Sequence, residues 1–481
     1  MTQKDIFAIL PTIIVAGWGV ILLVADLWIP RERKGIVAAL AVFGLAAAMG
    51  VALTMGGKAD TAFGGMVVVD GFSNYLTILF LASGIAGIAI AHDYLKRMQI
   101  IRGEYYVLML FSVAGMMMMA QANNLLMFFL SLEMLSIPLY ILTGFAHPKI
   151  ESEEASLKYF LMGAFASGFV LYGSAMIFGA TAQLGFPEII ASIKSGTANM
   201  VLLPIGAALL LVGFGFKVAA VPFHKWTPDV YQGAPSPVTG FMSVAVKAAG
   251  FAALLRIFIV IFPVISESLT PVFWVIAALT MITGNLIAVA QKNVKRMLAY
   301  SSIAHAGYIL TAFVAFGNNV VVNDMVAATL FYLLAYGLTS FGAWSVLVLV
   351  EKEYAQGLEL EDFSGLGTKY PWLGASMLVF MMSFAGIPLT MGFWGKFYLF
   401  RTAVGAGYSS LVLIGLITSI FSAFYYLRVV VFMFMKPGEP TVRRNFWVSL
   451  VIVGCALAVV LLSVVPDPII NLATSAMMLL Q

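Results

Sequence analysis

Three ionisable residues lie in the middle of long apolar stretches of the sequence. Lys217 and Lys247 occupy GAALLLVGFGFKVAAVPFHKW and VTGFMSVAVKAAGFAALLRIFIVIF, and Glu133 occupies LLMFFLSLEMLSIPLYIL. A charge near the centre of a membrane helix costs at least ~2.5 kcal/mol, so such residues usually face a polar interior and serve ions or protons. Their positions therefore predict proton or ion transfer.

Two further residues extend this set. Lys396 lies in the apolar stretch IPLTMGFWGKFYLF, and His305, whose imidazole titrates near neutral pH, lies in SSIAHAGYIL. Each candidate also has a structural interpretation. Glu133 and Lys217 can form an ion pair between helices, and His305 can hydrogen-bond to a neighbouring helix.

Basic residues outnumber acidic residues inside the apolar stretches. Glu133 is the only acidic residue deep in one of them, against six basic residues: Lys158, Lys217, Lys247, Arg256, Lys396 and Arg428. Burial disfavours the charged form of lysine, and a nearby like charge disfavours it further. Some of these lysines should therefore release a proton near neutral pH and act as proton carriers.

Three of the six basic residues lie nearer the ends of their stretches. Lys158 follows a cluster of glutamates, so a side chain that reaches the cytoplasmic surface is as good an interpretation as a role in transport. For Arg256 and Arg428 the structural interpretation is favoured.

Polar residues recur at helical spacing around the candidate residues, and prolines interrupt the same stretches. Residues three or four apart share one helix face, as in the sets Thr239, Ser243 and Lys247; Ser301, His305 and Tyr308; and Tyr332, Tyr336 and Thr339. Proline removes a backbone donor, and such interruptions at membrane depth are tolerated where they line a cavity or lie buried in protein. Pro138 interrupts one stretch in this way, and we predict broken helices at Pro222 and Pro388.

The composition indicates a membrane protein. Of its 481 residues, 62% are hydrophobic and only 10% are charged, against roughly 25% charged in a soluble domain. Apolar runs without period-two alternation favour helices, and only helices or closed barrels satisfy the backbone in lipid. We therefore predict an all-α polytopic membrane protein with no cleavable signal peptide.

Fourteen apolar segments are long enough to be membrane spans. The twelfth is too long for one straight helix, so we interpret it as two halves that meet near Pro388. The segments are 6–29, 36–55, 72–92, 104–121, 124–145, 156–181, 201–221, 237–262, 271–290, 297–316, 325–350, 370–403, 408–435 and 446–464.

The basic residues between these segments predict the orientation. With alternating loops, one face receives sixteen lysines and arginines, and the other receives four: Lys4, Lys58, Lys194 and Arg401. Cytoplasmic loops carry the excess of positive residues. The first face is therefore expected to be cytoplasmic, with both termini on the periplasmic side.

Redox chemistry within this chain is not expected. Its single cysteine, Cys455, cannot hold an iron–sulfur cluster, and its four histidines have no metal-ligand spacing. No glycine-rich nucleotide or phosphate motif follows a strand. The chain therefore needs no cofactor of its own, and any redox reaction belongs to another subunit.

Two longer motifs carry a family resemblance. VPFHKWTPDVYQGAPSPVTGFMSVAVKAAG (221–250) and KRMLAYSSIAHAGY (295–308), with the stretches around Glu133 and Lys396, resemble the antiporter-like subunits of respiratory complex I and of multisubunit sodium/proton antiporters. The resemblance covers roughly residues 70–435. Some complex I members have a long lateral helix and an extra span, or a glutamate in the twelfth span. This chain ends after fourteen predicted spans and has Lys396 there, which favours one bacterial type.

The resemblance implies an architecture. It predicts two five-helix repeats, 104–262 and 271–435. Because five spans invert the direction of the chain, the repeats would be inverted relative to each other. Three spans (1–103) precede them and one C-terminal span (436–481) follows.

The resemblance also implies a function. It predicts proton movement from cytoplasm to periplasm in the bacterial inner membrane, beside other membrane subunits of complex I. NADH, FMN, iron–sulfur clusters and quinone would lie in other subunits. The predicted path runs through Glu133, Lys217, Lys247, His305 and Lys396, with Lys158 as a possible member. The alternative is a subunit of a sodium/proton antiporter.

Overall fold

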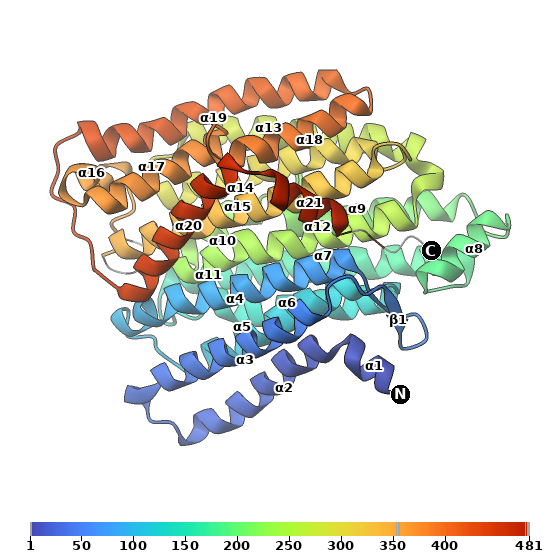
Figure 1. The fold of residues 1–481 in the computed structure, drawn as a ribbon, viewed down its shortest axis with the longest axis horizontal. Helices are drawn as coiled ribbons and strands as arrows, with labels where there is room; N and C mark the ends of the chain where they lie inside the picture. Colours follow the sequence, from blue (N-terminus) through green and yellow to red (C-terminus); the bar gives the residue numbers. More distant parts are fainter. Residues whose placement is uncertain (1, 353, 355, 477, 479–481) are drawn as a thin grey trace.

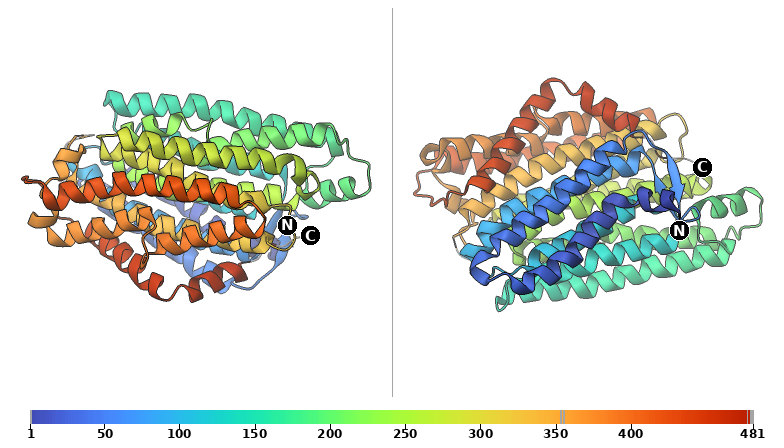
Figure 2. Two further views of the ribbon diagram at one scale, coloured as in Figure 1. Left: turned by 90° about the horizontal axis from the view of Figure 1, so that it is seen from above. Right: turned by 60° about the horizontal axis from the view of Figure 1, so that its bottom comes forward.

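The computed structural model describes residues 2–352, 354, 356–476 and 478. Within these residues the long helices lie side by side, and most of them run along the longest axis of the molecule (Figure 1). The first helix, α1 (Gln3–Ala8), and the last, α21 (Asp467–Ser475), lie toward the same end of this bundle (Figures 1 and 2). The bundle has the helical character that the continuous apolar segments predict.

The first part of the described chain forms three long helices, three short helices and a short β-hairpin. The first predicted segment, 6–29, is not one helix, because α1 ends at Ala8 and α2 begins at Leu10. Pro11 is tolerated in the first turn of α2, but its missing N–H cannot extend the preceding helix. The elements are α1 (Gln3–Ala8), α2 (Leu10–Ala25), η1 (Asp26–Trp28), η2 (Arg31–Arg33), α3 (Gly35–Thr54), the antiparallel strands β1 (Asp60–Ala62) and β2 (Val67–Val69), and α4 (Gly71–Arg97).

The next part of the bundle runs from α5 to α12. Helix α7 begins at Ile150, six residues before the predicted segment, because Glu151 and Glu153 stabilise its first turn. The elements are α5 (Glu104–Gln121), α6 (Leu125–Thr143), α7 (Ile150–Thr181), α8 (Phe186–Lys194), α9 (Leu202–Val218), α10 (Trp226–Gly233), α11 (Ser236–Phe241), the π-helical turn η3 (Met242–Val246) and α12 (Lys247–Val260).

The last part runs from η4 to α21. Helix α20 crosses the other helices obliquely, and the short α21 follows it (Figure 1). The elements are η4 (Pro263–Ile265), α13 (Ser266–Ala290), α14 (Val294–Leu310), η5 (Thr311–Ala315), α15 (Val322–Val350), η6 (Leu360–Phe363), α16 (Leu366–Lys369), α17 (Pro371–Ala385), α18 (Met391–Gly405), α19 (Ser409–Met435), α20 (Phe446–Val464) and α21 (Asp467–Ser475).

The two predicted helix breaks are present. Helix α9 ends before Pro222, and α17 ends before Pro388. In each case the first residue after the helix is left-handed: Ala219 has a φ of 61° and Gly386 a φ of 82°. By contrast, α6 continues through Pro138, so a single missing donor does not end that helix.

The helices define a polytopic membrane protein. Eleven helices among the described residues are long and apolar enough to cross a membrane, and α9 and α17 are shorter apolar helices. Within the 18-residue apolar windows of Ser236–Val260 and Val294–Ala315, 94% of the residues are buried inside the molecule, against 33% in those of Leu10–Trp28 and Phe446–Val464. The innermost helices are therefore the ones that carry Lys247 and His305.

Backbone hydrogen bonds join the predicted loops at each end of the bundle. At one end, the N–H of Asn123 donates to Met66 at 2.9 Å, and that of Phe186 to Asn123 at 3.1 Å. At the other end, the N–H of Leu360 donates to Lys292 at 3.0 Å. In both cases the hydrogen bonds join loops that the charge count assigned to the same face of the membrane.

Candidate functional site

Lys217 lies in the last turn of α9, directly before the first break, and is 4% exposed. Its amine lies 5.2 Å from the ring centroid of Tyr159 and 5.5 Å from that of Tyr140. In the described part of the chain this amine has no hydrogen-bond partner. Aromatic rings attract a cation weakly, so Lys217 is held without a fixed polar contact.

Glu133 is half-buried on α6 and lies within electrostatic range of Lys217. The two side chains form no direct ion pair among the described residues, so the interhelical pair weighed from the sequence is not formed. One oxygen of Glu133 and the hydroxyl of Tyr159 are buried without a hydrogen-bond partner among the described residues. Ordered water satisfies such groups in proteins, and we expect water to bind here.

Lys247 is the first residue of α12 and is 2% exposed. Its amine donates to the hydroxyl and the carbonyl of Ser302 on α14 and lies 5.6 Å from the ring centroid of Tyr336. The π turn η3 directly precedes it, and such turns are frequent at functional sites. The hydroxyls of Thr239 and Ser243 bond instead to backbone carbonyls.

An aromatic series joins the surroundings of Lys217 to those of Lys247. Tyr159 stacks on Trp226 with centroids 4.7 Å apart, and Trp226 lies 6.0 Å from Tyr231. Tyr231 in turn lies beside Ser302. Helix α10, which follows the first break, therefore lies between the two lysines.

His305 lies in the centre of α14 and is 3% exposed. Its Nδ1 lies 2.5 Å from the hydroxyl of Tyr332, and its Nε2 lies 3.0 Å from that of Tyr426. Ser301 bonds to the same Tyr426 hydroxyl, so Ser301 and His305 share one face as the spacing predicts. The ring of Tyr336 lies 5.1 Å from the imidazole and connects it to Lys247.

Lys396 lies in α18, beyond the second break, and is 6% exposed. Its amine donates to the carbonyl of Ala385 at 2.9 Å and to Ser419 at 2.7 Å. Ala385 is the last residue of α17, so the broken helix supplies the acceptor. The ring of Tyr308 lies 4.7 Å from the amine and 5.6 Å from His305.

The structure separates the other basic residues from this line. The amine of Lys158 bonds to Asp229 at 2.9 Å and Glu154 at 2.6 Å, with 41% of its side chain exposed. Arg256 forms two bonds to Asp70, at 2.7 and 2.9 Å, where both side chains are buried. Arg428 donates to two backbone carbonyls on α13 and at its end.

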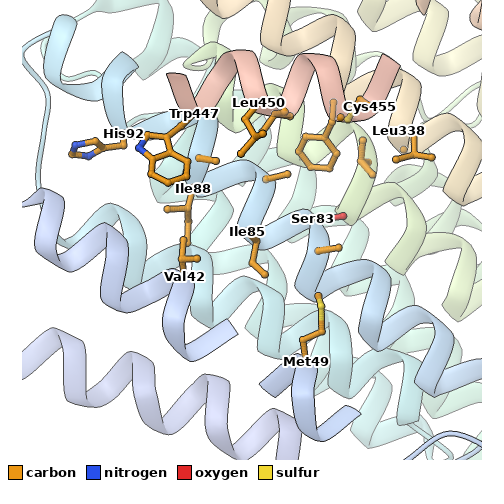
Figure 3. Close-up of a pocket in the computed structure, with 18 of the residues that line it drawn as sticks. Val42, Met49, Ser83, Ile85, Ile88, His92, Leu338, Trp447, Leu450 and Cys455 are labelled. Atoms are coloured by element: carbon orange, nitrogen blue, oxygen red, sulfur yellow. The ribbon is translucent and has the colours of Figure 1, made fainter. Parts of the chain in front are cut away.

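An apolar cavity of about 710 Å³ lies apart from the buried lysines. It is lined mainly by α3, α4, α15 and α20, and Figure 3 shows Trp447, Leu450 and Ile85 among its lining residues. None of the five residues of the predicted path lines it. Apolar walls in a membrane bundle suit hydrocarbon rather than a proton.

A bundle of apolar helices with two central breaks and a buried line of lysines defines a polytopic membrane subunit of the antiporter-like class. The chain belongs to the family described as "NADH:quinone oxidoreductase/Mrp antiporter, TM", whose model matches residues 122–422. This confirms the resemblance that the motifs carry.

Relatives and solved structures agree with this family. NADH-quinone oxidoreductase subunit N of Chloroflexus aggregans is 44% identical and covers 99% of this chain and 98% of its own length. A chain of respiratory complex I from Thermus thermophilus is 37% identical, with a TM-score of 0.82 over 96% of this chain and 99% of its own. A chain of the Mrp complex from Dietzia sp. has a TM-score of 0.86 over 99% and 97%, but 21% identity, which shows a shared fold.

Proposed function

We propose that this chain is a proton-translocating membrane subunit of an NADH:quinone oxidoreductase. It couples quinone reduction elsewhere in the complex to proton movement from cytoplasm to periplasm. One observation carries the proposal: Lys217, Lys247 and Lys396 are buried, and none of them forms an ion pair within the described residues. Burial without a counter-charge disfavours the charged form of an amine, so the neutral form becomes accessible and the amine can release its proton.

The proton path follows the hydroxyls and rings that join these amines. A proton enters from the cytoplasm near Lys247, whose contacts with Ser302 and Tyr336 lead to His305. His305 can accept at one nitrogen and donate from the other. From His305 the proton passes Tyr308 to Lys396 and leaves on the periplasmic side.

Glu133 acts on this path through Lys217. Coulomb attraction from the carboxylate stabilises the charged amine, and movement or neutralisation of that carboxylate removes the attraction. Lys217 then releases its proton toward Lys247 by way of Tyr159 and Tyr231. Moving one charge against 100 mV requires about 2.3 kcal/mol, which coupled redox chemistry can supply.

The architecture proposed with this function has fourteen crossings. It comprises three N-terminal spans (1–103), two inverted five-helix repeats (104–262 and 271–435) and a C-terminal span (436–481). The placement of α1 and α21 toward one end of the bundle supports an even number of crossings (Figure 1). The excess of basic residues on the opposite face supports a periplasmic location of both termini at the inner membrane.

The proposed partners are the other membrane subunits of complex I. NADH, FMN, iron–sulfur clusters and quinone bind in other subunits, in keeping with a chain that has one cysteine, Cys455. The alternative, a subunit of a sodium/proton antiporter, has less support. The chain of the Mrp complex from Dietzia sp. shares the fold but is 21% identical to this chain, whereas subunit N of Chloroflexus aggregans is 44% identical.

Three variants test the proposal in membranes that contain the assembled complex. Glu133→Ala and Lys217→Ala should each sharply reduce NADH oxidation and coupled proton pumping. Lys247→Arg should do the same, because arginine keeps its charge and does not deprotonate in proteins. Near-normal pumping in the first two would contradict the switch, and normal pumping in the third would show that Lys247 need not release its proton.

A further inference from the structure

A second buried carboxylate lies outside the line described above. Glu351 follows the last residue of α15 and is 1% exposed. It accepts hydrogen bonds from the hydroxyl of Tyr94 on α4 at 3.0 Å and from that of Ser236 on α11 at 2.5 Å. By sequence it belongs to the loop after an apolar segment, where an exposed side chain is the ordinary expectation.

Other ionisable groups surround this carboxylate. Lys295 on α14 is 1% exposed, donates to the carbonyl of Ala234 at 2.6 Å and lies within electrostatic range of Glu351. Arg97 approaches from α4, and Tyr354 from the segment that follows Glu351. The next residue, Lys352, has a side chain that is 49% exposed. The cluster therefore lies directly beneath the surface.

The helical segment that carries Lys247 and the helix that contacts it, α14, both begin at this cluster. Ser236 opens α11, which leads through η3 to Lys247. Lys295 lies in the first turn of α14, and Ser302 lies two turns further along the same face, roughly 10 Å away. Lys247 donates to Ser302.

Hydroxyl groups fill the interval between the cluster and Lys247. Tyr231 and Tyr336 both lie beside Ser302. Ser340 lies beside Tyr336, toward Glu351 along α15, and its hydroxyl is buried. Hydroxyls both donate and accept, so they can pass a proton directly or through water.

We propose that Glu351 is the site at which a proton from the cytoplasm is loaded before it reaches Lys247. An O–H bond of hydronium breaks, and one forms on a Glu351 carboxylate oxygen, leaving water. That O–H bond then breaks as a proton moves through the hydroxyls and an N–H bond forms on neutral Lys247. Lys295 positions the carboxylate and favours its return to the charged form. This inference rests on the proposed function.

A structural role for Glu351 gives a different expectation. Its hydrogen bonds with Tyr94 and Ser236 join α4, α11 and α15, and loss of a buried hydrogen-bonded group destabilises a protein whatever its protonation. A loading group, by contrast, acts through its proton. The two roles are separated by the dependence of the defect on pH and by rescue with a second carboxylate.

The test uses the assembled complex in inside-out membrane vesicles, with NADH-driven proton pumping measured over a range of pH. Glu351→Gln keeps the shape of the side chain, and we expect about tenfold slower pumping at neutral pH, since positioned proton-transfer groups contribute at least this much. The defect should shrink in acidic buffer, where protons are plentiful. Glu351→Asp should restore most of the rate. Asp26→Asn, in a buried carboxylate bonded to Lys34, is the matched control and should pump normally.

Two outcomes overturn the loading role: unchanged pumping in Glu351→Gln, or a loss that is equal at every pH and is not rescued by aspartate. If Glu351→Gln does not assemble, Ser236→Ala decides, because it removes one hydrogen bond and leaves the carboxylate. Near-normal pumping in both Glu351→Asp and Ser236→Ala supports loading, and a loss in both that is equal at every pH overturns it. If Lys247→Arg loses pumping and Glu351→Gln pumps normally, only the loading role of Glu351 is rejected. If Lys217→Ala and Lys247→Arg both pump normally, the proposed function is rejected.

Discussion

The two broken helices hold their lysines in opposite ways. Lys217 precedes the break at Pro222, and its amine lies among aromatic rings without a hydrogen bond from the described residues. Lys396 follows the break at Pro388, and its amine donates to Ala385, at the broken end of α17, and to a serine on α19. The first amine depends on the charge of Glu133, and the second on fixed acceptors.

This difference assigns different tasks to the two breaks in the proposed path. An amine without a fixed hydrogen bond responds strongly to a change in a nearby charge, because nothing else holds its proton. That property suits a switch. An amine anchored to a carbonyl keeps its position through each protonation step. That property suits the last relay before the proton leaves.

The largest expected effect is on transport and should be alike at both breaks. Lys217→Met and Lys396→Met each remove a proton carrier of the path while keeping a long side chain. Loss of a positioned proton-transfer group costs about a hundredfold or more, so we expect pumping to fall by about that factor in both variants. Pumping in vesicles with matched amounts of assembled complex measures it. Substantial pumping in either variant would remove that lysine from the path.

The same two variants should differ in stability. Lys217→Met loses no hydrogen bond to the described residues and removes a buried charge, so we expect unchanged or higher stability. Lys396→Met loses two hydrogen bonds from a charged donor and should be less stable by about 1–3 kcal/mol, although Ser419 can still donate to Ala385. Thermal denaturation of the purified complexes measures the difference. Equal loss in both would show that the two amines are held alike.

The sequence predicted the residues of this comparison but not their partners. Proline chemistry and apolar segments are local, so the breaks at Pro222 and Pro388 and the buried lysines could be found from the sequence. The partners depend on packing between helices far apart in the chain. Lys247 bonds to Ser302, which is 55 residues away, and His305 contacts Tyr426, which is 121 residues away. No spacing rule connects such positions.

Buried carboxylates were also missed for a physical reason. Asp70 and Glu351 stand beside apolar segments, where a charge usually reaches solvent, yet both are 1% exposed. Asp70 caps α4 and also binds Arg256, which is 186 residues away. The preference of aspartate for helix caps was a usable signal for its place at the start of α4. Its burial and its arginine partner were not visible in the sequence.

A glycine at the second break gives a smaller, local test of the comparison. Gly386 is left-handed, and a Cβ there would lie 2.9 Å from Cδ and 3.2 Å from Nζ of Lys396. Gly386→Ala should cost about 1–2 kcal/mol in backbone strain and displace the lysine, which lowers pumping. Gly407→Ala is the matched control, because Gly407 is also left-handed but has no heavy atom near its Cβ position. Equal pumping in both variants would show that the position of Lys396 is not critical.

The smallest effect is expected at Lys158, whose amine has carboxylate partners, whereas Lys217 and Lys396 form no ion pair among the described residues. Burial raises the pKa of Asp229, but hydrogen bonds from Lys158 and Arg296 lower the pKa by a larger amount. The pKa of Asp229 therefore lies below its usual value. A carboxylate with a lowered pKa contributes stability above its unfolded pKa and loses it only as pH falls through the lowered value. At neutral pH Lys158→Ala should therefore cost at most about 1 kcal/mol, as for other exposed ion pairs, and leave pumping near normal. Thermal denaturation and pumping of this variant beside Lys217→Met measure the contrast, and a comparable loss of pumping would place Lys158 in the proton path.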